Sequence, residues 1–183
     1  MFVGHEFLAF AAAGWVALRF GGDDRAAIHA GLVALLPDLD IGYAVATYAV
    51  AVAGGTPLGW EPFWGVANAT HRVVTHTLPT GGVATLVFGA AVAVVRRQGA
   101  AGARSRSRRG RVTTVTSAGL AVVGVATLLA GVRTAVSPAA AVVAAGFLAC
   151  VAATGWALAT RTELSTPAMT AAAGVGVVLH PFG

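Results

Sequence analysis

The chain has 183 residues, of which 57% are hydrophobic and only 10% charged, and its mean hydropathy is +0.78. Soluble globular domains carry about 25% charged residues, so this composition excludes an ordinary water-soluble fold. The net charge of +5 comes from twelve arginines without a lysine, and the single cysteine excludes an internal disulfide. At this length, five or six helices of about 20 residues would use nearly the whole chain. We predict an all-α, multi-pass transmembrane helical bundle that forms a single domain over residues 1–183.

Six apolar segments are the expected membrane-embedded elements. Three of them are uncharged and long enough to cross a hydrocarbon core of about 30 Å, and two are shorter but become plausible when their flanking polar residues reach the interface. A sixth is interrupted by polar residues. In chain order they are 7–18 (short), 26–53 (interrupted), 77–95, 112–132, 134–160 and 164–179 (short).

The interruption of the second segment is caused by Pro37, Asp38 and Asp40. Proline disfavours helical geometry in the residue before it, so we predict a broken element. Residues 26–40 would rise across the membrane, and residues 41–53 would form a re-entrant or interfacial helix.

Seven arginines lie in the Gly/Ala/Ser-rich segment 96–111, which has no apolar period and is predicted to be a flexible loop. The positive-inside rule makes this loop cytoplasmic. Alternation of the spans then brings His5, residues 60–76 and His180 together at the extracytoplasmic face. Attraction to anionic lipid accounts for the arginines more simply than nucleic-acid binding, which is therefore not favoured.

Asp38 and Asp40 are the most informative residues, because an ionised carboxylate at membrane depth costs several kcal/mol unless something compensates it. A divalent metal would do so, since carboxylates and neutral imidazoles are the usual ligands of zinc, manganese or iron. The alternative is that the two aspartates cap a broken helix at the interface.

His71 and His76 are the second candidate pair. Their five-residue spacing places them about 140° apart on a regular helix, so they would share a metal only if the helix begins between them. Thr75 or Thr77 would be the N-cap, with Pro79 in the first turn. Arg72, between the histidines, would clamp a phosphate or carboxylate, pair with one of the acidic residues, or anchor the chain at the interface.

Four other residues receive a simpler interpretation. His29 lies toward the cytoplasmic side and is interpreted as structural. Cys150, within an apolar run and without a metal-binding partner nearby, is interpreted as a packing residue. His5 and His180 are candidate ligands only because the predicted topology places both of them at the extracytoplasmic face.

Four motifs occur in the order Gly-His-Glu-Phe-Leu, Leu-Leu-Pro-Asp-Leu-Asp, His-Arg-Val-Val-Thr-His and His-Pro-Phe-Gly. In this order the chain resembles the YdjM-like family of membrane-bound, predicted metal-dependent hydrolases. The resemblance implies a polar metal-type site containing His5, Asp38, Asp40, His71 and His76, with His180 at its edge.

The chain departs from that family in two places. Ile41 stands where the family usually has an acidic residue or histidine directly after Pro-Asp-x-Asp. The last motif normally continues into an aspartate, whereas this chain stops at Gly183. The resemblance therefore implies that one ligand is missing or that the chain is truncated at its C-terminal end.

Our leading hypothesis is a membrane-bound metal-dependent hydrolase that acts on a lipid or a lipid-linked ester or phosphoester. A metal-bound water would be the nucleophile and Arg72 would stabilise negative charge on the substrate. The alternative is a non-enzymatic membrane protein, such as a metal or proton transporter, that uses the same aspartates and histidines.

Overall fold

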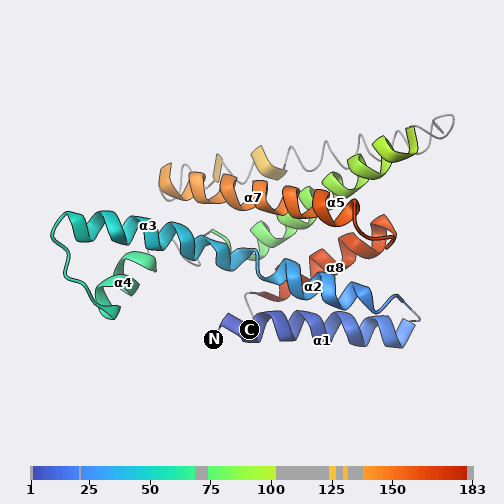
Figure 1. Ribbon diagram of the computed structural model, residues 1–183, viewed down its shortest axis with the longest axis horizontal. Coiled ribbons are helices and arrows are strands. Elements are labelled where there is room, and N and C mark those ends of the chain that lie inside the picture. The colour runs from blue at the N-terminus through green and yellow to red at the C-terminus, as the bar shows by residue number, and fades with distance from the viewer. Residues whose placement is uncertain are drawn as a thin grey trace.

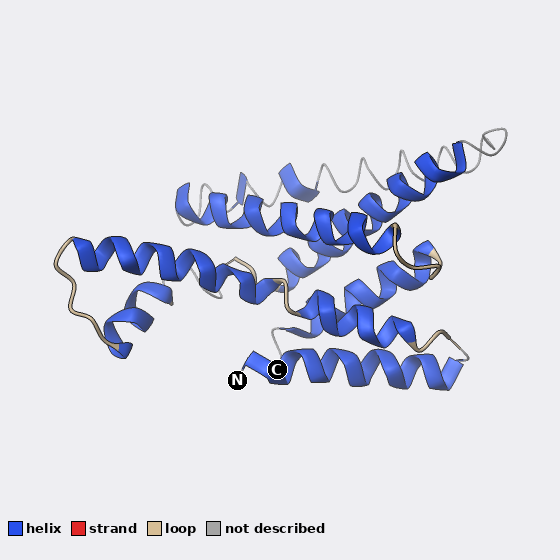
Figure 2. Ribbon diagram, in the orientation of Figure 1, coloured by secondary structure: helices blue, strands red, loops and turns tan. Residues whose placement is uncertain are grey.

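The described part of the protein is entirely helical. The computed structural model describes residues 2–20, 22–68, 74–101, 124–126, 130–131 and 138–180, and these contain no strand (Figures 1 and 2). The fold class predicted from composition is confirmed at this level. In chain order the elements are α1 (Phe2–Phe20), α2 (Arg25–Ala34), the 3₁₀ turn η1 (Pro37–Leu39), α3 (Asp40–Ala53), α4 (Trp60–Ala67), α5 (Leu78–Ala101), α7 (Pro138–Ala159) and α8 (Thr166–Leu179).

Three helical stretches of the described residues are long and apolar enough to cross a membrane. They are Arg25–Ala53, Leu78–Gln98 and Pro138–Ala159. Phe7–Phe20 and Thr166–Leu179 are shorter apolar helices, as predicted. The predicted span 112–132 lies outside the described residues except for 124–126 and 130–131.

The predicted break at Pro37 is confirmed, because η1 separates α2 from α3. Pro37 occupies the first position of this turn, where its missing N–H leaves no hydrogen bond unmade. Beyond the turn, α3 continues away from α2 and does not fold back along it (Figure 1). The 3₁₀ turn therefore interrupts a helical stretch that runs from Arg25 to Ala53, and the re-entrant or interfacial placement of residues 41–53 stays a prediction.

The two ends of helix α5 test the predicted N-cap near His76 and the predicted loop at residues 96–111. The hydroxyl of Thr77 accepts a hydrogen bond from the backbone N–H of Thr80 at 3.3 Å, so Thr77 is the N-cap and Pro79 lies in the first turn. At its other end α5 extends to Ala101. Residues 96–101 of the predicted arginine-rich loop are thus helical, and residues 102–111 lie outside the described residues.

Arg96, near the end of α5, is half-buried and forms hydrogen bonds with the loop that connects α7 to α8. Its guanidinium donates hydrogen bonds to the carbonyl oxygens of Thr162 and Leu164. This contact places the last turns of α5 level with the α7–α8 connection.

The short helix α4 was not predicted, and it carries a cluster of aromatic side chains. Phe63 packs edge-on against Tyr48 of α3, with ring centroids 5.4 Å apart, and Trp60 and Trp64 extend the cluster. The hydroxyl of Tyr48 also accepts a hydrogen bond from the backbone N–H of Gly59 at 2.8 Å. These contacts hold α4 against α3.

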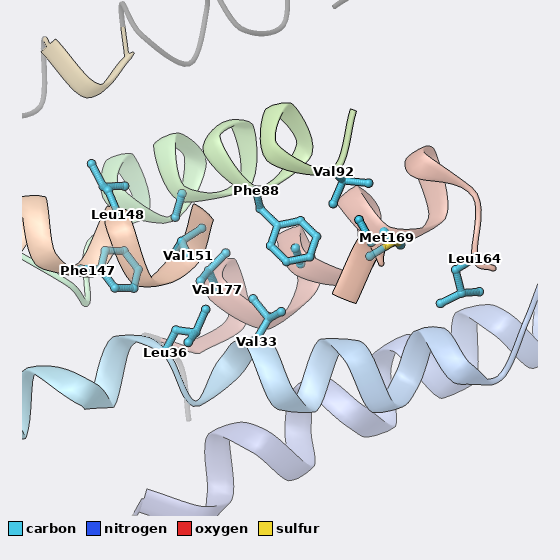
Figure 3. Packing of buried hydrophobic residues seen from close by; sticks show 13 residues of the cluster. Val33, Leu36, Phe88, Val92, Phe147, Leu148, Val151, Leu164, Met169 and Val177 are labelled. Carbon is cyan, nitrogen blue, oxygen red and sulfur yellow. The ribbon is translucent and has the colours of Figure 1, made fainter. Parts of the chain in front are cut away.

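The main core joins α2, α5, α7 and α8. Phe88 of α5 lies at its centre and is completely buried, with Val33 of α2, Val151 of α7 and Val177 of α8 around it (Figure 3). Leu36, which follows α2, and Val177 of α8 are buried in this same cluster (Figure 3). Since Leu36 precedes Asp38 by two residues and Val177 precedes His180 by three, core packing brings the polar ends of α2 and α8 together.

Two glycines allow α8 to approach its neighbours closely. A methyl group at Gly176 would lie 2.6 Å from the carbonyl oxygen of Ala30 in α2. A methyl group at Gly81 of α5 would lie 3.2 Å from the carbonyl oxygen of Val177. Small residues at helix interfaces are a common packing device in membranes, and here they bring together three helix ends.

We expect Gly176→Ala to destabilise the protein by about 1–3 kcal/mol, because the added methyl group meets backbone atoms of α2 that cannot move alone. Gly82→Ala is the matched control, since a methyl group there meets nothing within 4 Å. The control should leave stability unchanged or raise it by about 0.5–1 kcal/mol. Thermal unfolding in detergent, followed by tryptophan fluorescence, measures both; equal effects would contradict the close approach of α2 and α8.

Candidate metal centre

Three side chains meet where α2, α5 and α8 have their ends. Asp38 lies in η1, His76 lies two residues before α5, and His180 directly follows α8. Each position follows from a local signal: the proline turn for Asp38, the Thr77 cap for His76 and the end of an apolar helix for His180. The three ligand atoms lie within 4.8 Å of one another.

The three atoms form a compact triangle. Nε2 of His76 and Nε2 of His180 are 2.8 Å apart, and each lies 3.4 Å from Oδ1 of Asp38. His180 is completely buried, and the side chains of His76 and Asp38 are 7% and 12% exposed. An ionised carboxylate so far from water needs compensation, and a cation among the three atoms would supply it.

The dimensions fit a transition-metal ion. The centre of the triangle lies about 1.9 Å from each of the three atoms, against bond lengths of about 2.0–2.2 Å from zinc to imidazole nitrogen or carboxylate oxygen. With such bonds, neighbouring ligands of a tetrahedral site stand about 3.4 Å apart, which both nitrogen-to-carboxylate distances match. The two imidazole nitrogens are closer and would have to separate by about half an ångström.

A second layer of contacts supports His76. The hydroxyl of the buried Thr75 donates a 2.6 Å hydrogen bond to Oδ2 of Asp40 and lies 2.9 Å from Nδ1 of His76. An ionised carboxylate only accepts hydrogen bonds, so it takes the single proton of the hydroxyl. Nδ1 of His76 must then be the donor to Thr75.

The hydrogen bonds from His76 to Thr75 and from Thr75 to Asp40 determine which nitrogen of His76 can bind a metal. With its proton on Nδ1, a neutral imidazole carries its lone pair on Nε2, and Nε2 faces Asp38 and His180. Metal-binding histidines typically donate their other N–H to an outer partner that fixes this tautomer. Here the outer partner is the hydroxyl of Thr75, which is in turn bonded to Asp40.

The six expected ligands do not all reach one point in the described residues. Asp38, His76 and His180 do, so His180 is one of the three convergent residues, although the resemblance placed it at the edge of the site. Asp40, expected as a ligand, instead accepts a hydrogen bond from Thr75.

The remaining candidates lie partly or wholly outside the described residues. His71 and Arg72 belong to the undescribed segment 69–73. His5 lies in α1, which begins at the end of the molecule where α8 finishes (Figure 1), but its side chain is not described.

Sequence reasoning missed the role of Thr75, which we considered only as a helix cap. Thr75 and Asp40 are separated by 35 residues, and no local pattern links a threonine to so distant a carboxylate. The nearest signal was its position directly before His76, which allows its hydroxyl to reach the imidazole.

His29 and Cys150 stand apart from the centre. Nδ1 of His29 donates a 2.6 Å hydrogen bond to the carbonyl oxygen of Arg25, one turn earlier in α2, which agrees with a structural role. Cys150 is exposed on α7, so the expectation that it is a packing residue is wrong.

No protein-family model, curated protein or solved structure matches the chain. The resemblance to the YdjM-like family therefore stays a prediction that depends on the four sequence motifs. The interpretation of the centre depends on its own geometry.

We expect Thr75→Val to weaken zinc binding about 10–100-fold, the usual effect of removing an outer partner of a metal-bound histidine. Valine keeps the shape of threonine and removes only the hydroxyl that joins Asp40 to His76. Thr75→Ser keeps the hydroxyl and should bind zinc like the wild type. Titration against a competing chelator measures the affinities; weak binding by the serine variant together with normal binding by the valine variant would show that Thr75 acts through packing alone.

Proposed function

We propose that this chain is a multi-pass membrane protein that binds a divalent metal at Asp38, His76 and His180 and uses it to hydrolyse an ester or phosphoester of a membrane lipid or lipid-linked molecule. The observation that supports this most directly is the triangle of two imidazole nitrogens and one carboxylate oxygen, buried among apolar helices. The motif order that resembles the YdjM-like hydrolases supports the same activity.

The ligand set favours zinc, manganese or iron. Two histidines and one carboxylate form the catalytic zinc set of several metallohydrolases, and the same combination serves iron(II) in other enzymes. Zinc fits best, because two of the three distances match a tetrahedral site. The three ligands among the described residues leave a fourth position for water or substrate, as catalytic zinc sites require.

Each part of the centre has a distinct task in hydrolysis. The metal, when bound, supplies a water molecule whose pKa is lowered toward neutrality. Thr75 and Asp40 hold His76 in the tautomer and orientation that the metal needs. A metal held by Asp38, His76 and His180 would activate that water toward the carbonyl carbon or phosphorus of an ester, so that one water adds across the ester bond and an acid and an alcohol are released. Arg72 is proposed to stabilise the negative charge that develops.

We propose a bundle of five or six membrane-embedded helices, with the centre in the extracytoplasmic half. Arg96 and Arg97 lie at the end of α5 opposite to His76, and the positive-inside rule makes that end cytoplasmic. From the level of the α7–α8 connection to His180, the 14 residues of α8 rise about 21 Å, roughly two thirds of a hydrocarbon core of about 30 Å.

A transporter is the less favoured alternative, because it needs polar groups that continue from the centre toward the cytoplasm. The polar residues of α2 on that side are Arg25, exposed at the start of the helix, and His29, whose Nδ1 is bonded to the carbonyl oxygen of Arg25. Val33, Ala34 and Leu36, between His29 and Asp38, are buried and apolar. The neighbourhood of the centre therefore supports hydrolysis at a fixed site better than passage of an ion.

We expect purified wild-type protein to contain about one equivalent of divalent metal, and Asp38→Asn to lose it, because an amide is a poor metal ligand. Asp24→Asn is the matched control, since Asp24 is exposed at the start of α2 and far from the centre along that helix. Elemental mass spectrometry measures the metal. Equal metal content in wild type and Asp38→Asn would contradict the site.

The activity test uses the same proteins in phospholipid vesicles, with lipid products identified by mass spectrometry. Wild type and Asp24→Asn should release a hydrolysed lipid, and Asp38→Asn should not. Bound metal without any hydrolysed lipid would retain the site and overturn the hydrolase assignment.

A further inference from the structure

A groove between α3 and α7 opens beside the metal centre. It has a volume of about 280 Å³. Leu39, Asp40 and Tyr43 line it from the side of α3, and Gly146, Phe147 and Cys150 line it from α7. Apart from Asp40, its walls are mostly hydrocarbon and aromatic surface.

The open side of the groove lies within the apolar length of α7. Gly146 is about 20 Å from the Ala159 end of this helix and about 12 Å from the Pro138 end. Pro138–Ala159 is one of the stretches long and apolar enough to cross a membrane, and in the proposed transmembrane arrangement this part of its surface faces hydrocarbon. Val142 at the rim is 63% exposed and Leu39 is 55% exposed, which continues the groove into the lipid-facing surface of α7 and α3.

The inner end of the groove reaches the polar network of the centre. Asp40 lines the groove and is only 7% exposed, and its carboxylate accepts the hydrogen bond of Thr75, which contacts His76. An apolar channel with one polar end suits an amphipathic molecule. A hydrocarbon chain would fill the part between Leu39 and Phe147, and the polar linkage at its end would lie beside Asp40.

We propose that this groove binds one hydrocarbon chain of a membrane phospholipid, entering sideways from the bilayer between α3 and α7. Its volume is slightly below the range of about 300–1,000 Å³ that is usual for small-molecule pockets, so it holds part of one chain and not a whole lipid. Delivery of the ester linkage to the metal centre rests on the proposed hydrolase function. Binding of the hydrocarbon chain in the groove does not rest on that function.

Gly146 offers a way to fill the groove without disturbing the helices. A Cβ atom there meets nothing within 4 Å, so Gly146→Leu places its side chain in the groove without a backbone clash. Gly82→Leu is the matched control, because Gly82 also has open space around it, is exposed on α5 and lies outside the groove.

The experiment uses the full chain in phosphatidylethanolamine and phosphatidylglycerol vesicles that contain a phosphatidylethanolamine with a photoactivatable diazirine on one acyl chain. After illumination, crosslinked residues are mapped by mass spectrometry. In wild type and Gly82→Leu we expect crosslinks at Tyr43, Phe147 and Cys150 in clear excess over Trp156, which is 48% exposed on α7 but does not line the groove. In Gly146→Leu the excess should disappear.

Two results would overturn the proposal: crosslinks that are no more frequent in the groove than at Trp156, or the same pattern in Gly146→Leu as in wild type. Thiol crosslinking of Cys150, the single cysteine of the chain, into a covalent dimer in vesicles would assign the groove to a second copy and also overturn it. The metal content separates this proposal from the previous one. Gly146→Leu should keep its metal, and Asp38→Asn should keep the groove crosslinks.

Discussion

The carboxylate of Asp38, buried at the end of an apolar helix, is the constraint on which the rest of the structure depends. Charge at such a depth is costly unless opposite charge or polar partners surround it. Two histidines surround this carboxylate: His76 just before α5 and His180 directly after α8. The Nε2 atom of each lies 3.4 Å from Oδ1 of Asp38. Three segments far apart in the sequence are thereby tied to one point, and a divalent cation would complete the charge balance.

The helix packing is arranged to make this convergence possible. Gly176 lets α8 approach the backbone of α2, and Gly81 lets α5 approach α8 one to two turns from the ligands. A larger residue at either position would separate the helix ends and open the triangle of ligand atoms. The hydrogen bonds from Asp40 through Thr75 to His76 then set the orientation of one imidazole. Helix packing therefore determines where the ligands lie, and the hydrogen bonds through Thr75 determine which nitrogen of His76 faces the proposed metal.

Local signals predicted the parts of this arrangement that depend on short stretches of chain. Proline chemistry predicted the break before Asp38, and Thr75 or Thr77 ahead of Pro79 predicted a helix that begins close to His76, where Thr77 is the cap in the structure. The cost of buried charge predicted that Asp38 needs a partner, and the structure supplies His76 and His180. The contact of Asp40 with Thr75 was not predictable, because it depends on the way two helix ends meet. Helix α4 was also missed, since its eight residues include a glutamate and a proline and show no long apolar run.

The central claim is that Asp38, His76 and His180 bind the same metal ion. X-ray absorption spectroscopy of the zinc-loaded protein tests it most directly, because imidazole rings give a characteristic outer-shell scattering. We expect four nitrogen or oxygen ligands at about 2.0–2.1 Å with the outer-shell signal of two imidazoles, and of one imidazole in the variant His180→Gln. A wild-type spectrum without imidazole scattering, or one that His180→Gln leaves unchanged, would contradict it.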